Sequence, residues 1–244
     1  MIGSKNTFAV IILFLLLACK KENRWDMIKR TGKEIKEERI VAHVKYFNFG
    51  KGKMNFYFTN SPTYKVEVEA GENLIDLIKT FVEGDTLYVT NENKCNWARS
   101  YKPQVNIYIS TPDLRQVVEY GQGQLKSTNT LTGQFLSFET WSTCDIAIDI
   151  NCDSLRTHLH NSASVTATGF AKTHYSSMWH NSTFWGDDLI TESTEIYNNT
   201  TGNFYCHVNS ELSAAMVLSG NIIYSGSPSI RIDNLGGIGK VLKK

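Results

Sequence analysis

Aromatic and histidine side chains recur at nearly constant intervals in the second half of the 244-residue chain. Tyr120, Trp141, His160 and His180 follow one another at steps of 21, 19 and 20 residues. Rings presented in a row on one surface can stack on flat ligands such as sugar faces, so these residues form a candidate ligand-binding face. His158 precedes His160 by two residues and would share its side of an extended strand.

Two other interpretations of these residues stay open. Cross-strand aromatic pairs stabilise sheets by about 0.2–1 kcal/mol each without any ligand. The three histidines, His158, His160 and His180, would lie within about 7 Å of one another and could bind a transition metal weakly. We expect the rings either to stabilise the sheet or to bind a ligand, and we expect no metal and no cofactor.

Carboxylates offer a second kind of chemistry, because parallel β-helices commonly host polysaccharide lyases and hydrolases. Such enzymes need paired carboxylates on neighbouring coils, often with calcium and a basic residue. The repeat region offers acidic residues at Glu139, Asp145, Asp149, Asp153, Asp187 and Asp188. They form no stacked acidic column, and no nucleophile elbow, zincin motif or phosphate loop occurs. We therefore expect no catalytic residues, with a polysaccharide-processing enzyme as the alternative.

The N-terminus carries a targeting signal. Its apolar run of about ten residues is too short for a bilayer core that needs about 20, but it suits a secretory signal peptide. The run ends in Leu17, Ala18 and Cys19, which resembles the bacterial lipoprotein box. That resemblance implies cleavage of residues 1–18 and acylation of Cys19, which would anchor the chain in a membrane. An ordinary cleaved signal followed by a chance cysteine is the alternative.

Composition narrows the partners. The chain has 25 Lys and Arg against 24 Asp and Glu, and hydrophobic residues make up 41%. These values fit a folded protein, and the balanced charge argues against nucleic-acid binding. Residues 20–39 hold eight basic and five acidic residues. We expect residues 19–40 to be a charged tether that is either a solvated linker or a contact for anionic lipids.

An internal repeat begins near residue 112. A turn of small residues followed by an apolar residue recurs about every 19 residues, with the apolar positions at Leu125, Ile146, Val165, Trp185, Phe204, Ile222 and Val241. Phe184 is the alternative in the fourth coil, and Trp185 is preferred because it aligns the His-Asn-Ser triplets at 160–162 and 180–182. This period and the lack of helix signals predict an all-β, right-handed parallel β-solenoid with coils about 4.8 Å apart.

The solenoid is expected to follow an N-terminal set of strands. Alternating segments at 64–69 and 105–109 indicate separate strands over 41–111, and the repeat coils fill 112–244 of a domain spanning 41–244. The residues expected to face the core six positions before each turn are Val117, Phe138, Thr157, Ser177, Ile196 and Ala214. Lys240, Lys243 and Lys244 are expected to blunt the open end of the stack with charge.

The remaining cysteines allow two interpretations. Cys95, Cys144, Cys152 and Cys206 could form disulfides in an oxidising compartment or remain buried thiols, and their spacing does not decide between these. Strand alternation places Cys206 inward, in the coil below Tyr224. Cys95, Trp97 and Arg99 are expected to seal the entrance to the solenoid rather than to react.

Three sequence motifs resemble those of a known family. They are VEAG at 68–71 with its continuation to residue 80, NKCNWARS at 93–100, and GNIIYSGSP at 220–228. Over about 43–230 the chain resembles the auto-transporter adhesin, head GIN domain family. Of that family's Gly-x-Gly turns, only those at 121–123 and 237–239 keep both glycines. The resemblance implies a β-solenoid lipoprotein and assigns no ligand.

The function expected from these observations is adhesion or ligand binding without catalysis. The partners are a membrane, reached through the lipid anchor, and a surface glycan or protein. The expected location is the bacterial cell envelope, as an outer-membrane lipoprotein that faces either the periplasm or the exterior.

Overall fold

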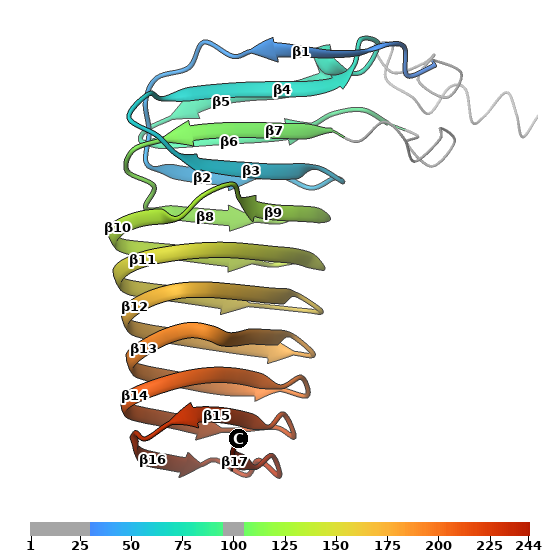
Figure 1. The fold of residues 1–244 in the computed structure, drawn as a ribbon. Helices are drawn as coiled ribbons and strands as arrows, with labels where there is room; N and C mark the ends of the chain where they lie inside the picture. The colour runs from blue at the N-terminus through green and yellow to red at the C-terminus, as the bar shows by residue number, and fades with distance from the viewer. Residues whose placement is uncertain (1–29, 95–104) are drawn as a thin grey trace, which may run out of the picture.

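The computed structural model describes residues 30–94 and 105–244, whose strands form one sheet wound into an elongated column (Figure 1). The elements of its N-terminal part are β1 (Glu34–Glu38), β2 (Tyr46–Phe49), β3 (Asn55–Asn60), β4 (Lys65–Gly71), the 3-10 turn η2 (Ile75–Leu77), β5 (Ile78–Glu83), β6 (Thr86–Asn91) and β7 (Asn106–Thr111). Those of the C-terminal part are β8 (Gln116–Glu119), β9 (Gly123–Ser127), β10 (Leu131–Thr140), β11 (Cys144–Leu159), β12 (Ser164–His180), β13 (Thr183–Thr200), β14 (Phe204–Met216), β15 (Ile222–Gly226), β16 (Ser229–Asn234) and β17 (Val241–Lys243).

From β8 onward the chain is the predicted β-solenoid. All strand pairs within β8–β17 are parallel, and each long strand bends from one wall of the column to the other. The start of β11 pairs with β9, for example, whereas its second part pairs with β10. The first wall therefore holds β9, the starts of β11–β14, β15 and β17. The second wall holds β8, β10, the ends of β11–β14, and β16.

The core lies between these walls, because alternate residues along each strand point inward. The inward column of the first wall runs through Leu125, Ile146, Val165, Phe184, Phe204 and Ile222, all 2% exposed or less. Tight turns join the walls. A Cβ on Gly220 would lie 2.0 Å from the carbonyl oxygen of Gly202 one coil away, so that turn accepts only glycine.

The expectation that Trp185 faces the core is wrong. Val165 pairs with Phe184, which is fully buried, while Trp185 is 43% exposed on the outer surface. The physical reason is packing: the ring of Phe184 stacks on Phe204 at 4.7 Å inside the column. The two His-Asn-Ser triplets are consequently offset by one residue. Of the predicted inward residues, Ser177 is also displaced, and Ser176 takes its place between Thr157 and Ile196.

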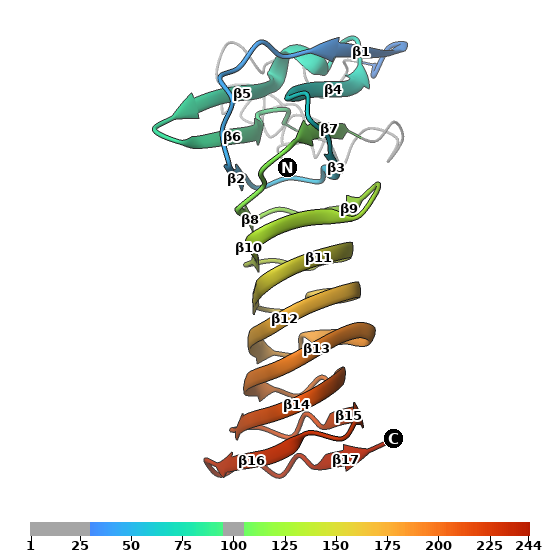
Figure 2. The ribbon, with the colours of Figure 1, turned by 60° about the vertical axis from the view of Figure 1, so that its left-hand side comes forward.

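The N-terminal strands extend the solenoid rather than standing apart from it. β2 and β3 pair in parallel with β8 and β9, and β6 and β7 pair in parallel with β2 and β3. Antiparallel strands then end the stack, since β5 pairs with β6, β4 with β7, and β1 with β4 (Figure 2). Ile75 and Ile78 are 1% and 2% exposed beneath this cover.

The predicted tether is therefore too long at its C-terminal end. Residues 34–38, assigned from their charge to the tether, form β1 and pair with β4. Ile35 packs against the core, and the charged neighbours on either side point outward. The folded domain thus begins before residue 41. No helix of the described residues is long and apolar enough to cross a membrane.

Candidate functional site

The second wall carries a row of rings on its outer surface, which we call the outer aromatic column: Tyr120, Trp141, His160 and Trp179. Each side chain stands at the end of a strand, directly before the turn to the next coil. The rings of Trp141 and His160 stack with centroids 3.9 Å apart and planes 8° apart. His160 and Trp179 are nearly parallel at 5.9 Å. Tyr120 and Trp141 are 40% and 45% exposed.

Stacking decides which ring surfaces a ligand can reach. Because the Trp141 and His160 faces contact each other, a bound molecule can reach the edges of these two rings but not the faces in this contact. A carboxylate borders these edges: the indole N–H of Trp141 donates a short hydrogen bond to Glu139, two residues earlier on the same strand. The column therefore combines apolar edges with a charged acceptor.

Burial disfavours the charged form of His158 and His160. Partial burial lowers the pKa of both His158 and His160, and the carboxylate of Glu139 only partly opposes this effect. The ring of His158 lies 5.8 Å from Tyr175, tilted by 56°. Neutral imidazoles donate and accept hydrogen bonds, which suits a polar, uncharged ligand.

His180 sits beside the column rather than in it. Its ring is 6.4 Å from His160 and tilted by 51°, and its backbone φ of 65° matches that of Asn161 one coil earlier, at 58°. The Nδ1 of His180 accepts a hydrogen bond from the Asn161 amide at 3.1 Å. The residue stacked on His160 is Trp179, which sequence reasoning missed because the fourth coil is one residue out of the expected register. Within residues 30–94 and 105–244, no group of three metal-binding side chains is assembled.

Asp149 and Asp187, two acidic residues of the repeat region, make polar contacts. Asp149 accepts hydrogen bonds from Thr130 and, at 3.2 Å, from Thr168 on flanking coils. Asp187 pairs with Lys244 at 2.7 Å. These bonds give Asp149 and Asp187 structural roles, whereas Glu139 contacts the outer aromatic column.

A second pair of exposed rings lies on the first wall. Trp185 and Tyr205 stack at 4.4 Å with their planes 7° apart, and the Lys244 ammonium lies 5.8 Å from the Tyr205 ring. Sequence reasoning placed Trp185 inside the column and so could not find this pair. The alternative register of the fourth coil, with Phe184 facing the core, would have placed Trp185 on the outer surface beside Tyr205.

His174 and Glu119 are buried inside the coils. Burial lowers the pKa of His174 to about 3, and its Nε2 is hydrogen-bonded to the Thr157 hydroxyl at 3.0 Å. Burial also raises the pKa of Glu119 to about 7, although the Gly121 amide donates to its carboxylate at 2.6 Å. His174 is 2% exposed and Glu119 is 2% exposed, so both belong to the interior and not to a ligand site.

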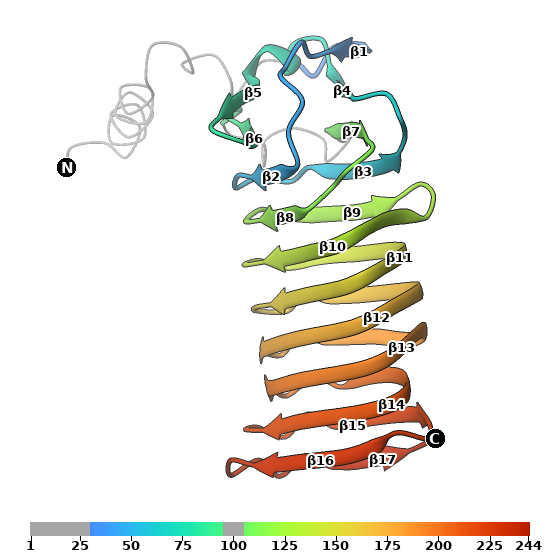
Figure 3. The same ribbon diagram turned by 90° about the vertical axis from the view of Figure 1, so that its left-hand side faces the viewer.

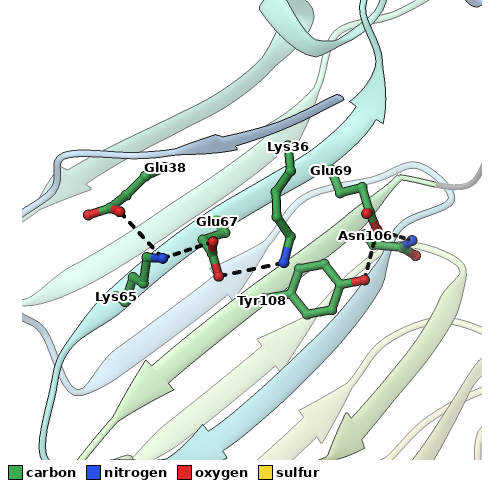
Figure 4. Close-up of polar contacts among 7 residues, drawn as sticks. All are labelled: Lys36, Glu38, Lys65, Glu67, Glu69, Asn106 and Tyr108. Atoms are coloured by element: carbon green, nitrogen blue, oxygen red, sulfur yellow. Dashed lines mark hydrogen bonds and ion pairs between the residues drawn. The ribbon is translucent and has the colours of Figure 1, made fainter. Parts of the chain in front are cut away.

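A polar network covers the outer face of the N-terminal strands. The Lys36 ammonium lies 3.9 Å from the centre of the Tyr108 ring and 3.6 Å from Glu67. The Tyr108 hydroxyl donates a hydrogen bond to Glu69 at 2.7 Å. Hydrogen bonds from Asn106 and Tyr108 lower the pKa of Glu69. Burial, together with the nearby Glu69 carboxylate, raises the pKa of Tyr108 to about 12. The residues joined are Lys36, Glu38, Lys65, Glu67, Glu69, Asn106 and Tyr108 (Figure 4). The network ties β1 to β4 and β7, a structural role.

The cysteines divide between two groups. Cys144, Cys152 and Cys206 are free and buried, so for these three the buried-thiol alternative is correct. Cys206 is 3% exposed and pairs in register with Tyr224, as predicted, and burial raises the pKa of its thiol to about 12. The predicted lipidation site Cys19 and the predicted entrance seal of Cys95, Trp97 and Arg99 lie outside the described residues.

Comparisons with known proteins agree with this architecture. The family model described as putative auto-transporter adhesin, head GIN domain, matches residues 50–228. A putative adhesin from Bacteroides fragilis is 21% identical with a TM-score of 0.80, over 87% of this chain and 97% of that one. A putative lipid binding protein from Parabacteroides distasonis is 18% identical with a TM-score of 0.69, over 87% of this chain and 97% of that one. A putative adhesin from Parabacteroides merdae is 16% identical with a TM-score of 0.67, over 88% of this chain and 98% of that one. At these identities the likeness concerns the fold. No curated protein matches the chain in sequence.

Proposed function

This chain belongs to the putative auto-transporter adhesin, head GIN domain family, and we propose that it is a lipid-anchored, non-catalytic protein of the bacterial cell envelope that binds a surface glycan. The observation that carries the proposal is the outer aromatic column on a rigid wall of parallel coils. A solenoid holds such a column in place without a ligand, because each ring is fixed by the strand beneath it.

The chemistry of the column favours a carbohydrate. Sugars present C–H faces that pack on aromatic surfaces and hydroxyls that bond to carboxylates and imidazoles. Trp141 and Tyr120 supply the exposed ring surface, and Glu139 supplies a charged acceptor beside it. His158 and His160, whose charged forms are disfavoured by burial, add hydrogen-bond donors and acceptors.

The glycan is tested by presenting the purified protein to an array of bacterial and host oligosaccharides. We expect Glu139→Gln to weaken binding of the preferred glycan by about tenfold, since a hydrogen bond to a charged group is worth about 1.5–3 kcal/mol. Glu195→Gln, on the outer face of the same wall and away from the column, is the matched control and should bind normally. Equal binding by both variants and wild type would remove Glu139 from the site.

The anchor is tested by cell fractionation. Wild type should sit in the membrane fraction, and Cys19→Ala should become soluble or keep an uncleaved signal. Membrane attachment that survives this substitution, with a mature start beyond residue 19, would contradict lipidation. Protease added to intact cells then separates a surface-exposed domain, which is removed, from a periplasmic one, which is protected.

A further inference from the structure

The two ends of the solenoid differ in how their strand edges are covered. At the N-terminal end the antiparallel strands β1, β4 and β5 and the turn η2 cover the core. At the C-terminal end β16 and β17 form the last coil, and no described segment pairs with their free edges (Figure 3). An unpaired strand edge can pair with another chain unless it is protected.

In the last coil, the positions that face the core in the other coils are exposed. Ile230 and Ile232 pair in register with Leu212 and Ala214, each 1% exposed, yet are themselves 41% and 46% exposed. Leu235, in the loop that follows, is 58% exposed. Apolar side chains gathered in this way at one end of a protein mark an interaction surface.

The predicted protection by lysines reaches only one of the two walls. Lys243 of β17 pairs in register with Tyr224, so a charge stands at the open end of the first wall. Lys244 is directed away to Asp187. β16, on the second wall, carries no lysine. Its outer face instead holds Arg231 and Asp233, joined by an exposed ion pair at 3.0 Å.

The charges on β16 are self-complementary under antiparallel pairing. If two β16 strands run antiparallel about a two-fold axis at Ile232, Arg231 of each copy lies opposite Asp233 of the other. Ile232 then faces Ile232, and Ile230 faces Asn234 on the core side. Opposite charges in directly opposed positions stabilise such a pair, and like charges destabilise it.

We propose that the C-terminal end of the solenoid docks a second copy of this chain through antiparallel β16–β16 pairing centred on Ile232. The pairing satisfies the free backbone groups of both edges and covers the isoleucines of both last coils. It leaves the outer aromatic column of each copy exposed and directs the two columns away from a shared midpoint, so the dimer is a bivalent version of the glycan binder. The dimer does not depend on the proposed glycan.

Sedimentation velocity of the purified protein over a concentration series tests the association. Wild type should form a dimer. Arg231→Asp or Asp233→Arg alone places like charges opposite each other twice per dimer and should raise its dissociation constant about tenfold or more. The double swap Arg231→Asp with Asp233→Arg should restore association. A protein that is monomeric at every concentration, or a dimer indifferent to the single swaps, overturns the proposal.

Cross-linking tests the register independently. Opposed residues of an antiparallel pair have Cα atoms about 4.5–5.5 Å apart, within reach of a disulfide. Ile232→Cys should therefore give a covalent dimer under mild oxidation, at a position exposed enough not to disturb folding. Ser213→Cys, one coil above, is the control and should behave like wild type. Failure of Ile232→Cys to cross-link above the wild-type background contradicts the pairing.

Discussion

Two groups of stacked rings occupy neighbouring coils, one inside the solenoid and one outside. The inner ring cluster is His174, Phe184 and Phe204, with centroids 4.7–5.8 Å apart and all three side chains buried. The outer aromatic column stacks at comparable distances, 3.9 and 5.9 Å, with its edges in solvent. Rings therefore gather both inside the solenoid, where His174 on one wall meets Phe184 and Phe204 on the other, and on its outer surface. Exposure separates a structural stack from a candidate binding site. Removing a buried ring should lower the free energy of unfolding more than removing an exposed one.

The largest expected effect comes from adjacent residues on opposite sides of the first wall. Phe184→Ala removes a fully buried ring and should lower the free energy of unfolding by about 3–5 kcal/mol. Trp185→Ala removes an exposed ring and should cost about 1 kcal/mol or less. Urea unfolding of the two variants measures the difference. A larger loss for Trp185→Ala would restore the register expected from the His-Asn-Ser triplets.

The inner cluster should also confer sensitivity to acid. The folded pKa of His174 is about 3, below its unfolded value of 6.5, so its contribution is complete above pH 6.5 and is lost as pH falls toward 3. Between pH 6.5 and 4 this amounts to about 3 kcal/mol. In His174→Leu that part of the dependence should vanish, measured by urea midpoints at each pH. A parallel decline in both proteins would mean that other groups control acid unfolding.

Glu119 should act in the opposite direction. Its folded pKa of about 7 exceeds its unfolded value of 4.5, so stability is fully present below pH 4.5 and declines as pH rises through 7. The loss of unfolding free energy by pH 7 is at most about 3 kcal/mol, because solvent screening of the Glu119 carboxylate reduces it. Glu119→Gln should flatten this part of the profile. The exposed counterpart Glu139→Gln should leave it unchanged, and an equal response from both would argue against burial as the cause.

Sequence reasoning found the outer positions of the first three coils. The steps of 21 and 19 residues from Tyr120 to Trp141 and His160 gave the right strands and the right face. The expected step of 20 residues to the next coil is one longer than the observed step of 19, so Trp179 stands in the column and His180 does not. Local similarity of the two triplets favoured the wrong register, whereas burial of Phe184 against Phe204, a contact between coils, decides it.

Long-range pairing explains the other differences. β2 and β3 belong to the same stack as β6 and β7, but β4 and β5 lie between them in the chain, so no period marks these coils. β1 reads as a charged linker because its single apolar residue, Ile35, matters only once β4 is beside it. The polar core group of His174 and Thr157 depends on a hydrogen bond between coils that spacing cannot reveal.

The smallest expected effect on stability belongs to the outer aromatic column, whose removal shows whether it binds the glycan. In the double variant Trp141→Ala, His160→Ala, melting temperature should shift by only a few degrees, because cross-strand ring contacts contribute about 0.2–1 kcal/mol each. The matched control, Trp185→Ala with Tyr205→Ala, removes the exposed pair of the other wall. Binding of both variants to the glycan array and to intact cells is measured beside wild type. We expect binding to fall at least about tenfold in the first variant alone. Undiminished binding by a folded Trp141→Ala, His160→Ala protein would contradict it.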